Sequence, residues 1–244
     1  VAGLEWIQLD RANLEGGRRT AAHTRLQDGE ETVLIIGDAR NPRGRHQFTS
    51  QTRGATSVET VDLGDLTVFA RRFDLTRADA LEHLVNFAGD VMTGVSATTH
   101  LGRIKTLQGG RARNSPSPAE DAALAFAKQP TLGAALQVLQ QLEAQPGARV
   151  FRPEMLNCCL SAMRSVAGEK TFLDAVLQAR ERNRHYGRPV ARRAVGSTLL
   201  LKGLEADVAV ILQPEQMDAC NLYVALTRGA KRVLVCSERS VLSS

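Results

Sequence analysis

Short apolar runs, separated by polar residues that favour turns, occupy both ends of the chain. Near the amino end, the runs 4–9 and 32–36 predict two strands, and Gly37-Asp38 stops the second. Near the carboxyl end, the same pattern predicts strands at 198–201, 208–212 and 232–236 and a helix at 217–227. Near-continuous apolar strands joined through a helix indicate a parallel sheet covered on both faces, so the pattern predicts an α/β fold.

The part of the chain that follows the second strand has a less regular pattern. Residues 41–60 are rich in Arg, Gly, Ser and Thr and predict a loop. The apolar run 66–70 predicts a further strand, and Thr76 is placed to cap a helix that Gly89 ends. Residues 103–116 are rich in Gly, Arg, Asn, Ser and Pro, which is typical of a linker.

Helical periodicity dominates the next part of the chain. Ser117-Pro118-Ala119-Glu120 is a capping box with proline at the first helical position, and it predicts a helix to about Lys128. Three more helices are predicted to begin at Thr131, Arg152 and Thr171, and to end at Pro146-Gly147, near Gly168 and near Tyr186-Gly187. We therefore expect an all-helical insert over 115–189.

Composition places the chain among folded, non-secreted proteins. Of its 244 residues, 43% are hydrophobic, enough to bury a substantial core. No apolar run reaches the roughly 18 residues of a membrane span, and the amino end carries charges where a signal peptide is apolar. The four cysteines form no Cys-x-x-Cys pair, so neither a zinc site nor a disulfide framework is expected. These features predict a cytoplasmic protein with no membrane partner and no metal site of its own.

The charge balance permits a phosphate-bearing or nucleic-acid partner without requiring one. The net charge is +5 and arginine outnumbers lysine, and arginine pairs bidentately with phosphate. Aromatic residues make up only 4% of the chain, too few for the base-stacking platform that many single-strand binders use.

Two segments carry the most informative chemistry. Residues 196–211 read Gly-Ser-Thr-Leu-Leu-Leu-Lys-Gly-Leu-Glu-Ala-Asp-Val-Ala-Val-Ile. This pattern predicts a strand, then a Lys-Gly turn that a ligand can approach closely, then an acidic residue and a buried strand. Residues 221–232 read Asn-Leu-Tyr-Val-Ala-Leu-Thr-Arg-Gly-Ala-Lys-Arg, an amphipathic helix that delivers Thr227 and Arg228 to its carboxyl end. An arginine at that place can reach a phosphate held by a neighbouring domain.

Together these segments resemble motifs V and VI of the UvrD/Rep/PcrA-like superfamily 1 DNA helicases. The usual forms there are Thr-x-His-x-x-Lys-Gly-Leu-Glu-x-Asp-x-Val and Leu-Tyr-Val-Ala-Leu-Thr-Arg-Ala. The resemblance implies a RecA-like parallel sheet flanked by helices, the second such domain of the family, made here of 61–114 and 190–244. The helical insert at 115–189 would then be a reduced form of the family's accessory 2B domain.

The resemblance also implies a nucleotide site. Arg228 would stabilise charge on the γ-phosphate of ATP as an arginine finger, Glu205 would contact the ribose hydroxyl, and Gly203 would lie against the nucleotide. ATP with Mg would be held mainly by a first RecA-like domain outside this sequence. The competing interpretations are a solvated turn acid for Glu205 and a surface ion pair for Arg228.

A single-stranded DNA partner follows from the same resemblance. Ser197, Thr198 and Lys202 would face the strand, where a hydroxyl or an ammonium group can donate to phosphate. The chain departs from the family pattern at Leu199, where histidine is usual, and at Leu200. These changes remove polar groups from part of the expected DNA contact.

A third segment, 64–71, reads Gly-Asp-Leu-Thr-Val-Phe-Ala-Arg and is similar to the strand that opens the second domain in that family. Arg71 or Arg72 would then meet a phosphate, or would simply be solvated charges beside a helix.

Two elements needed for ATP hydrolysis are missing from the sequence. The family uses a Gly-x-x-x-x-Gly-Lys-Ser/Thr loop to cradle phosphate and an Asp-Glu pair to hold magnesium and activate water. The sequence contains no Gly-Lys dipeptide and no Asp-Glu dipeptide. We therefore expect no ATP hydrolysis by residues 1–244 alone.

Residues 1–60 allow two interpretations. The segment 7–13 resembles a Walker B strand with Arg11 in place of the catalytic glutamate, and 34–41 resembles motif III with Asn41 in place of glutamine. Residues 1–60 would then be a degenerate remnant of the first RecA-like domain. The alternative is an ordinary strand-and-loop segment.

Three functions remain open at this point. The first is the C-terminal part of an ATP-dependent DNA helicase, which supplies the arginine finger and part of the DNA track. The second is a non-catalytic pseudo-helicase that binds nucleic acid or a protein. The third is a nuclease-fused repair subunit, for which the sequence offers no metal-binding carboxylate cluster.

Overall fold

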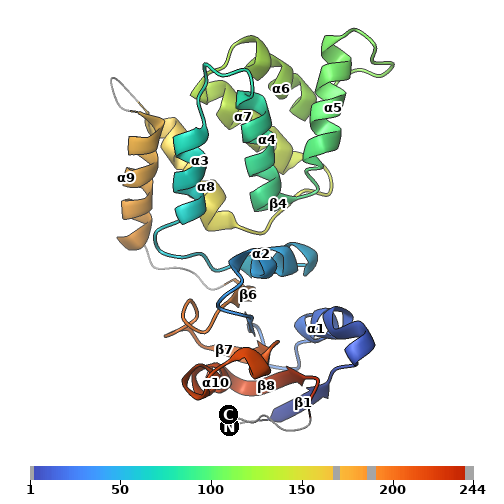
Figure 1. The fold of residues 1–244 in the computed structure, drawn as a ribbon, viewed down its shortest axis with the longest axis vertical. Helices are drawn as coiled ribbons and strands as arrows, with labels where there is room; N and C mark the ends of the chain where they lie inside the picture. Colours follow the sequence, from blue (N-terminus) through green and yellow to red (C-terminus); the bar gives the residue numbers. More distant parts are fainter. Residues whose placement is uncertain (1–2, 167–170, 186–190, 240–244) are drawn as a thin grey trace. The chain divides into compact units, whose positions relative to one another are not determined.

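The computed structural model describes residues 3–166, 171–185 and 191–239. Contacts divide the chain into two compact units, which are drawn in Figure 1. We call residues 1–59 and 188–244 the sheet unit, and residues 60–187 the helical unit. Within the described ranges, every helix is too short or too polar to cross a membrane.

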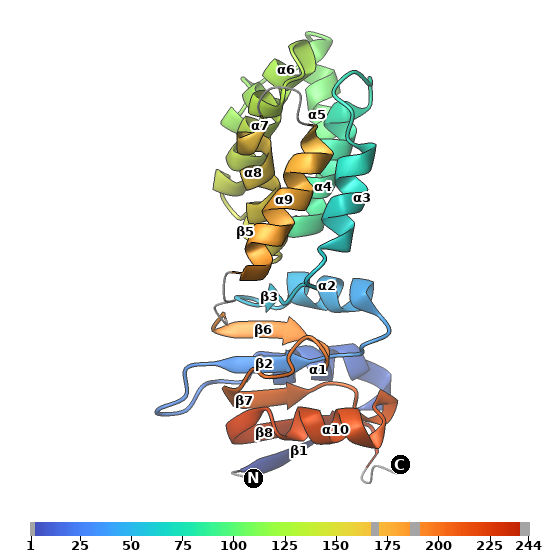
Figure 2. The ribbon, with the colours of Figure 1, turned by 90° about the vertical axis from the view of Figure 1, so that its left-hand side faces the viewer.

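The sheet unit is built on one parallel sheet. Its six described strands lie in the order β1-β8-β7-β2-β6-β3, and Figure 2 shows their arrowheads pointing the same way. The α/β class with a parallel sheet is therefore as the sequence predicts. The strands are β1 (Leu4–Gln8), β2 (Val33–Ile36), β3 (Thr56–Ser57), β6 (Arg193–Gly196), β7 (Ala206–Ile211) and β8 (Gly229–Ser237).

Helices cover both faces of this sheet. On one face, Ala22 and Phe48 pack against buried strand residues such as Ile35. On the other face, Ala225 packs against strand residues such as Ile36. All four residues of β2 are buried, which explains why this strand reads as an unbroken apolar run. The helices are α1 (Leu14–Ala22) and α2 (Pro42–Gln51) on the first face and α10 (Ala219–Leu226) on the second.

The chain crosses the sheet in two directions. From β1 through β2 to β3 it moves one way, with α1 and α2 on the first face. From β6 through β7 to β8 it moves back, with α10 on the opposite face. The connections that leave the carboxyl ends of the neighbours β2 and β7 therefore go to opposite faces. Such a switch point opens a crevice at the carboxyl edge of a parallel sheet.

The structure divides the chain differently from the boundaries that the sequence suggested. β1 pairs with β8, and β2 pairs with both β7 and β6, so residues 1–60 do not form a separate segment. They supply three strands of the same sheet, which leaves no separate remnant of a first domain. Residues 61–114 group with the helices of 115–187 and not with the sheet.

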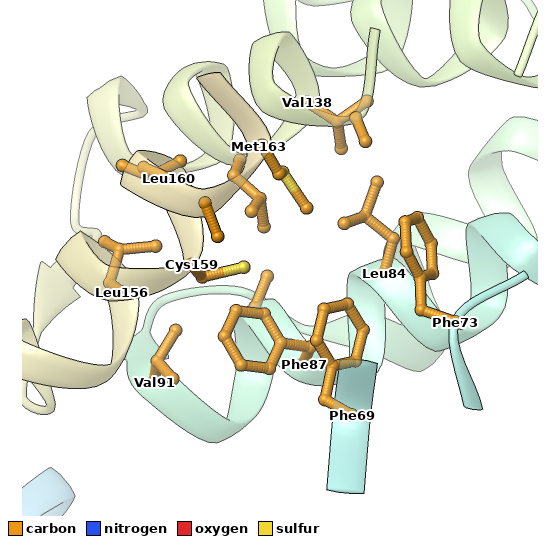
Figure 3. Packing of buried hydrophobic residues seen from close by; sticks show 14 of the residues in the cluster. Phe69, Phe73, Leu84, Phe87, Val91, Val138, Leu156, Cys159, Leu160 and Met163 are labelled. Atoms are coloured by element: carbon orange, nitrogen blue, oxygen red, sulfur yellow. The ribbon is translucent and has the colours of Figure 1, made fainter. Parts of the chain in front are cut away.

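The helical unit holds α3 to α9 and one short antiparallel strand pair, β4 with β5. Its core joins several helices: Figure 3 shows Phe69 and Phe87 beside Leu84, Cys159 and Met163. The rings of Phe69 and Phe87 stack with centroids 4.2 Å apart. The elements are α3 (Gly64–Arg72), α4 (Ala80–Val91), β4 (Met92–Thr93), α5 (Ala97–Gln108), α6 (Pro118–Lys128), α7 (Leu132–Ala144), β5 (Arg149–Val150), α8 (Pro153–Ser165) and α9 (Phe172–His185).

The predicted start at Thr76 and end at Gly89 are wrong, because α4 begins at Ala80 after Asp79 and continues past Gly89 to Val91. Two other helix boundaries agree with the caps that the sequence predicts. The capping box at Ser117 forms, with Glu120 Oε2 accepting from Ser117 N at 2.8 Å, and α6 ends at Lys128. Thr131 caps α7 as predicted. The predicted helix ends at Gly168 and at Tyr186-Gly187 lie outside the described residues.

The predicted strand at 66–70 is wrong, because these residues form α3. Leu66, Phe69 and Ala70 are all buried, and their i, i+3, i+4 spacing places them on one helical face toward the core. A short apolar run fits a buried strand and a buried helix equally well, so packing decides between them. The similarity of 64–71 to the opening strand of a helicase domain does not hold, and Arg71 and Arg72 end α3.

The predicted loop at 41–60 is also wrong over its first half, which forms α2. Asn41 Oδ1 accepts from Gly44 N at 2.8 Å, and Pro42 occupies the first helical position. These two start signals were present in the sequence, but Phe48 is the only large apolar residue of α2 and leaves almost no periodicity. The predicted linker at 103–116 is likewise shortened, because α5 continues to Gln108.

A buried ion pair ties the loop after α1 to β8. Arg232 Nε and Nη2 donate to the two carboxylate oxygens of Glu30 at 3.0 and 2.9 Å. The two side chains are only 9% and 4% exposed. The hydrogen bonds from Arg232 hold the pKa of Glu30 below its ordinary value. Nη2 also donates to Arg25 O at 3.0 Å, so one guanidinium organises the whole loop.

Replacing Glu30 with Gln should lower the free energy of unfolding by about 3 kcal/mol, because it leaves a buried guanidinium with only the 3.5 Å pair that it makes with Glu5. Since folding lowers the pKa of Glu30, its contribution is present above the ordinary pKa of 4.5 and is lost as the pH falls through the folded value. Urea unfolding at neutral and acidic pH measures both effects. Glu31→Gln, which changes an exposed side chain, is the control, and an E30Q protein as stable as E31Q would refute the assignment.

Candidate functional site

We call residues 196–211 the first motif and residues 221–232 the second motif. Between Gly196 and Ala206, the first motif forms a loop that runs from the carboxyl end of β6 back to the amino end of β7. Ser197 O accepts from Leu201 N at 3.0 Å, and Leu201 is buried between the sheet and α10. A Cβ on Gly196 would lie 2.9 Å from the side chain of Leu201, so a glycine there lets the loop close. The predicted strand at 198–201 is therefore wrong: the strand ends at Gly196, and these residues turn.

Arg228 joins this loop to the second motif. Its Nε donates to Val224 O and its Nη1 to Leu204 O, both at 3.0 Å. Its Nη2 donates to Thr227 Oγ1 at 3.0 Å. Leu204 belongs to the first motif, so one half-buried guanidinium holds the two motifs together. In the part of the chain that the structure describes, no carboxylate pairs with Arg228, which excludes the surface ion pair there.

Glu205 lies beside this junction with its carboxylate free. The side chain is exposed, and no described residue forms a hydrogen bond or ion pair with it. The backbone N–H of the next residue, Ala206, donates to Arg228 O at 3.1 Å. Glu205 and Arg228 immediately precede β7 and β8, so both lie at the amino edge of the sheet.

Lys202 and Gly203 form the exposed part of the loop. Gly203 has φ +84°, in the left-handed region, and no atom lies within 4 Å of the place where a Cβ would stand. The backbone at Gly203 is therefore open to a ligand, while Lys202 extends an exposed ammonium group next to it.

Ser197 and Thr198 lie at the opposite, carboxyl edge of the sheet and are both buried. Thr198 Oγ1 and Asn221 Oδ1 are 2.6 Å apart, and Asn221 Nδ2 donates to Asp218 Oδ2 at 2.9 Å. The Thr198 hydroxyl therefore links the loop to the start of α10, since it must donate to the amide oxygen. Leu199, by contrast, is 76% exposed. The structure thus separates the predicted DNA residues Ser197 and Thr198 from Arg228 and Glu205.

Asp207, the last acid of the first motif, has a structural role that the sequence did not reveal. Its carboxylate accepts from Glu31 N at 2.8 Å and Thr32 N at 3.1 Å, and pairs with Lys231 Nζ at 2.8 Å. These donors, led by Lys231, hold the pKa of Asp207 far below its usual range. Asp207 therefore clamps the amino ends of β2, β7 and β8 together.

Other candidate residues play no visible part in this site. Arg11, which the Walker B resemblance put in place of a catalytic acid, lies after β1 and pairs with Glu238 at 3.7 Å. Among the residues described, no group of His, Cys, Asp and Glu is arranged to hold a metal ion.

No protein-family model and no curated protein matches the chain.

The close fit between Gly196 and Leu201 gives a test of the loop. Gly196→Ala should lower the free energy of unfolding by about 1–3 kcal/mol, because the added methyl group overlaps a buried leucine. Gly102→Ala is the matched control: it lies inside α5 with open space around it and should stabilise the protein by about 0.5–1 kcal/mol. Equal unfolding midpoints for the two variants in urea would contradict this account of the loop.

Proposed function

We propose that the sheet unit is the second RecA-like domain of a superfamily 1 DNA helicase, with the helical unit inserted between β3 and β6 as a reduced accessory domain. The observation that carries the proposal is the junction between the two motifs. Arg228 binds Leu204 O, and the free carboxylate of Glu205 stands next to that bond. The two motifs therefore meet at the amino edge of the sheet, where Arg228 and Glu205 would face a nucleotide held by another domain.

The hydrogen bonds of Arg228 leave it able to act on a phosphate. A guanidinium has five N–H donors, and three of them bind Val224, Leu204 and Thr227. One N–H on each terminal nitrogen remains, and the three bonds hold the side chain in one orientation. Such a pre-oriented cation stabilises charge that develops on a γ-phosphate without having to reorganise.

ATP with Mg belongs in a cleft that the first RecA-like domain completes. When bound, the nucleotide supplies the phosphoanhydride bond whose cleavage drives the motor, and magnesium neutralises its charge. The residues of this chain bind and orient: Glu205 accepts from a ribose hydroxyl, and Gly203 lets the backbone approach. Closure of the cleft brings Arg228 to the nucleotide, and opening withdraws it.

The carboxyl edge would contact single-stranded DNA mainly through backbone groups. Leu199 is 76% exposed, and its N–H group has no hydrogen-bond partner among the residues described, so this group is available to a phosphate oxygen. This contact does not need the histidine that the family usually has at position 199. Ser197 would add a hydroxyl group. Lys202 lies next to Gly203, farther along the loop, so the structure does not group it with Ser197 and Thr198.

A second candidate is a non-catalytic pseudo-helicase that binds nucleic acid or a protein. It is favoured by the bonds of Arg228 to its own unit, which give that arginine a structural role even without a nucleotide. Both candidates place the protein in the cytoplasm, in keeping with four cysteines that are all free.

Replacing Arg228 with Ala in a protein that joins this chain to a first RecA-like domain should lower kcat for ATP hydrolysis by at least about a thousandfold. The loss of its bonds should also reduce the free energy of unfolding by about 1–2 kcal/mol, with the circular dichroism spectrum unchanged. The matched control is Arg43→Ala, which removes an exposed arginine of α2. Normal turnover in folded R228A protein would refute the nucleotide role.

A comparison of ATP hydrolysis with and without single-stranded DNA separates the two candidates. The longer protein should hydrolyse ATP and should be stimulated by DNA, while residues 1–244 alone should be inactive. If the longer protein is inactive but binds DNA, the pseudo-helicase is the correct function.

A further inference from the structure

A cavity lies at the carboxyl edge of the sheet, between α1 and α2. Its volume is about 290 Å³, and its lining includes Gly37 after β2 and Leu212 after β7. It therefore lies where the chain leaves the carboxyl ends of β2 and β7, next to the switch point, on the face covered by α1 and α2. The carboxyl edge is the usual place for a ligand in an open α/β sheet. Its polar lining includes Arg18, Arg19, Arg45, Asn41 and Gln213.

Arg45, which lines this cavity, is a buried cation that forms no ion pair with any described carboxylate. The residue is only 8% exposed, and the one hydrogen bond that its guanidinium makes with the described residues runs from Nη1 to the backbone oxygen of Asp38. No carboxylate in the described ranges lies within 4.0 Å of its guanidinium. Proteins normally pair buried charges, because an isolated one is costly to remove from water. Burial accordingly lowers the pKa of Arg45.

The unused donors of Arg45 border the cavity. A guanidinium has five N–H donors, and this one uses a single donor within the protein. None of its nitrogen atoms is both fully buried and unpartnered, so each unpaired nitrogen keeps some surface accessible to solvent. Gly37 makes room for the side chain: a Cβ there would lie 3.3 Å from Arg45 Cγ.

The charged groups around Arg45 leave the cavity positive. Arg18 is also buried, with Nε donating to Leu212 O at 3.1 Å and Nη1 to Glu15 at 2.8 Å. Arg19 adds an exposed guanidinium at the rim. Of the two lining carboxylates, Glu15 is already paired with Arg18, and Asp38 accepts from the backbone of its own turn at Arg40. Glu59, which interacts with Arg45 through space, lies 3.8 Å from His46.

We propose that this pocket binds a small phosphate monoester, with the phosphate group on Arg45 and Arg18. The forked guanidinium matches the oxygen pairs of phosphate, whose negative charge supplies what Arg45 lacks. The cavity is larger than phosphate alone requires, and the amide groups of Asn41 and Gln213 can receive a polar organic group. The pocket lies at the opposite edge from Arg228 and Glu205, so it does not depend on the nucleotide site proposed above.

Calorimetric titration of the full chain with inorganic phosphate and with AMP, at constant ionic strength, tests the proposal. Both probes should bind saturably, with AMP the tighter. Arg45→Gln should weaken binding by about tenfold or more, because it removes a charge-assisted bidentate contact. Arg43→Gln removes an exposed charge from the same helix outside the pocket and should bind like the wild type.

Arg19→Gln provides a second variant that leaves the buried residues unchanged. It should weaken binding severalfold, and it decides the question if the R45Q protein does not fold. Absence of saturable binding by the wild type, or equal affinities for the wild type and both pocket variants, would overturn the proposal. Binding that depends on Arg228 instead of Arg45, or binding of a short single-stranded oligonucleotide that phosphate does not displace, would overturn it as well.

Discussion

Parallel strands can be joined only by connections that cross a face of the sheet, and this constraint arranges the sheet unit. The first three strands place α1 and α2 on one face, and the last three place α10 on the other. The reversal opens the crevice at the carboxyl ends of β2 and β7. Because β6 and β7 are parallel, the first motif must also connect opposite edges of the sheet. Ser197 lies at the carboxyl edge and Glu205 at the amino edge. The parallel connections therefore place functional candidates at both the carboxyl edge and the amino edge of the sheet.

Arg228 and Arg45 differ in how their guanidinium groups are hydrogen-bonded within the protein. Arg228 is half-buried and binds two carbonyl oxygens and one hydroxyl group, so its position is specified before any ligand arrives. The guanidinium of Arg45 is more deeply buried but makes a single hydrogen bond and no ion pair among the described residues. The first arrangement suits a group that must act on a transition state. The second suits a group whose counter-charge comes from outside.

The sequence predicts those features that neighbouring residues specify. The apolar run at 32–36 predicts β2, and the capping box at Ser117 predicts α6, because each signal is local. The run at 66–70 fits both a strand and a helix, and only the surrounding helices decide that it forms α3. The motifs identify Arg228 and Glu205 as candidates through their order in the chain. The burial of Arg45 and the clamp at Asp207 depend on strand pairings between distant segments, which no local pattern encodes.

The central claim is that the amino edge of the sheet faces nucleotide and the carboxyl edge faces DNA. Hydrogen exchange on a protein that includes the first RecA-like domain measures the protection of backbone amides at both edges in one experiment. A non-hydrolysable ATP analogue should slow exchange at 202–206 and 226–229, and single-stranded DNA should slow it at 197–200. Protection of neither edge, or of the two edges by the opposite ligands, would contradict the account.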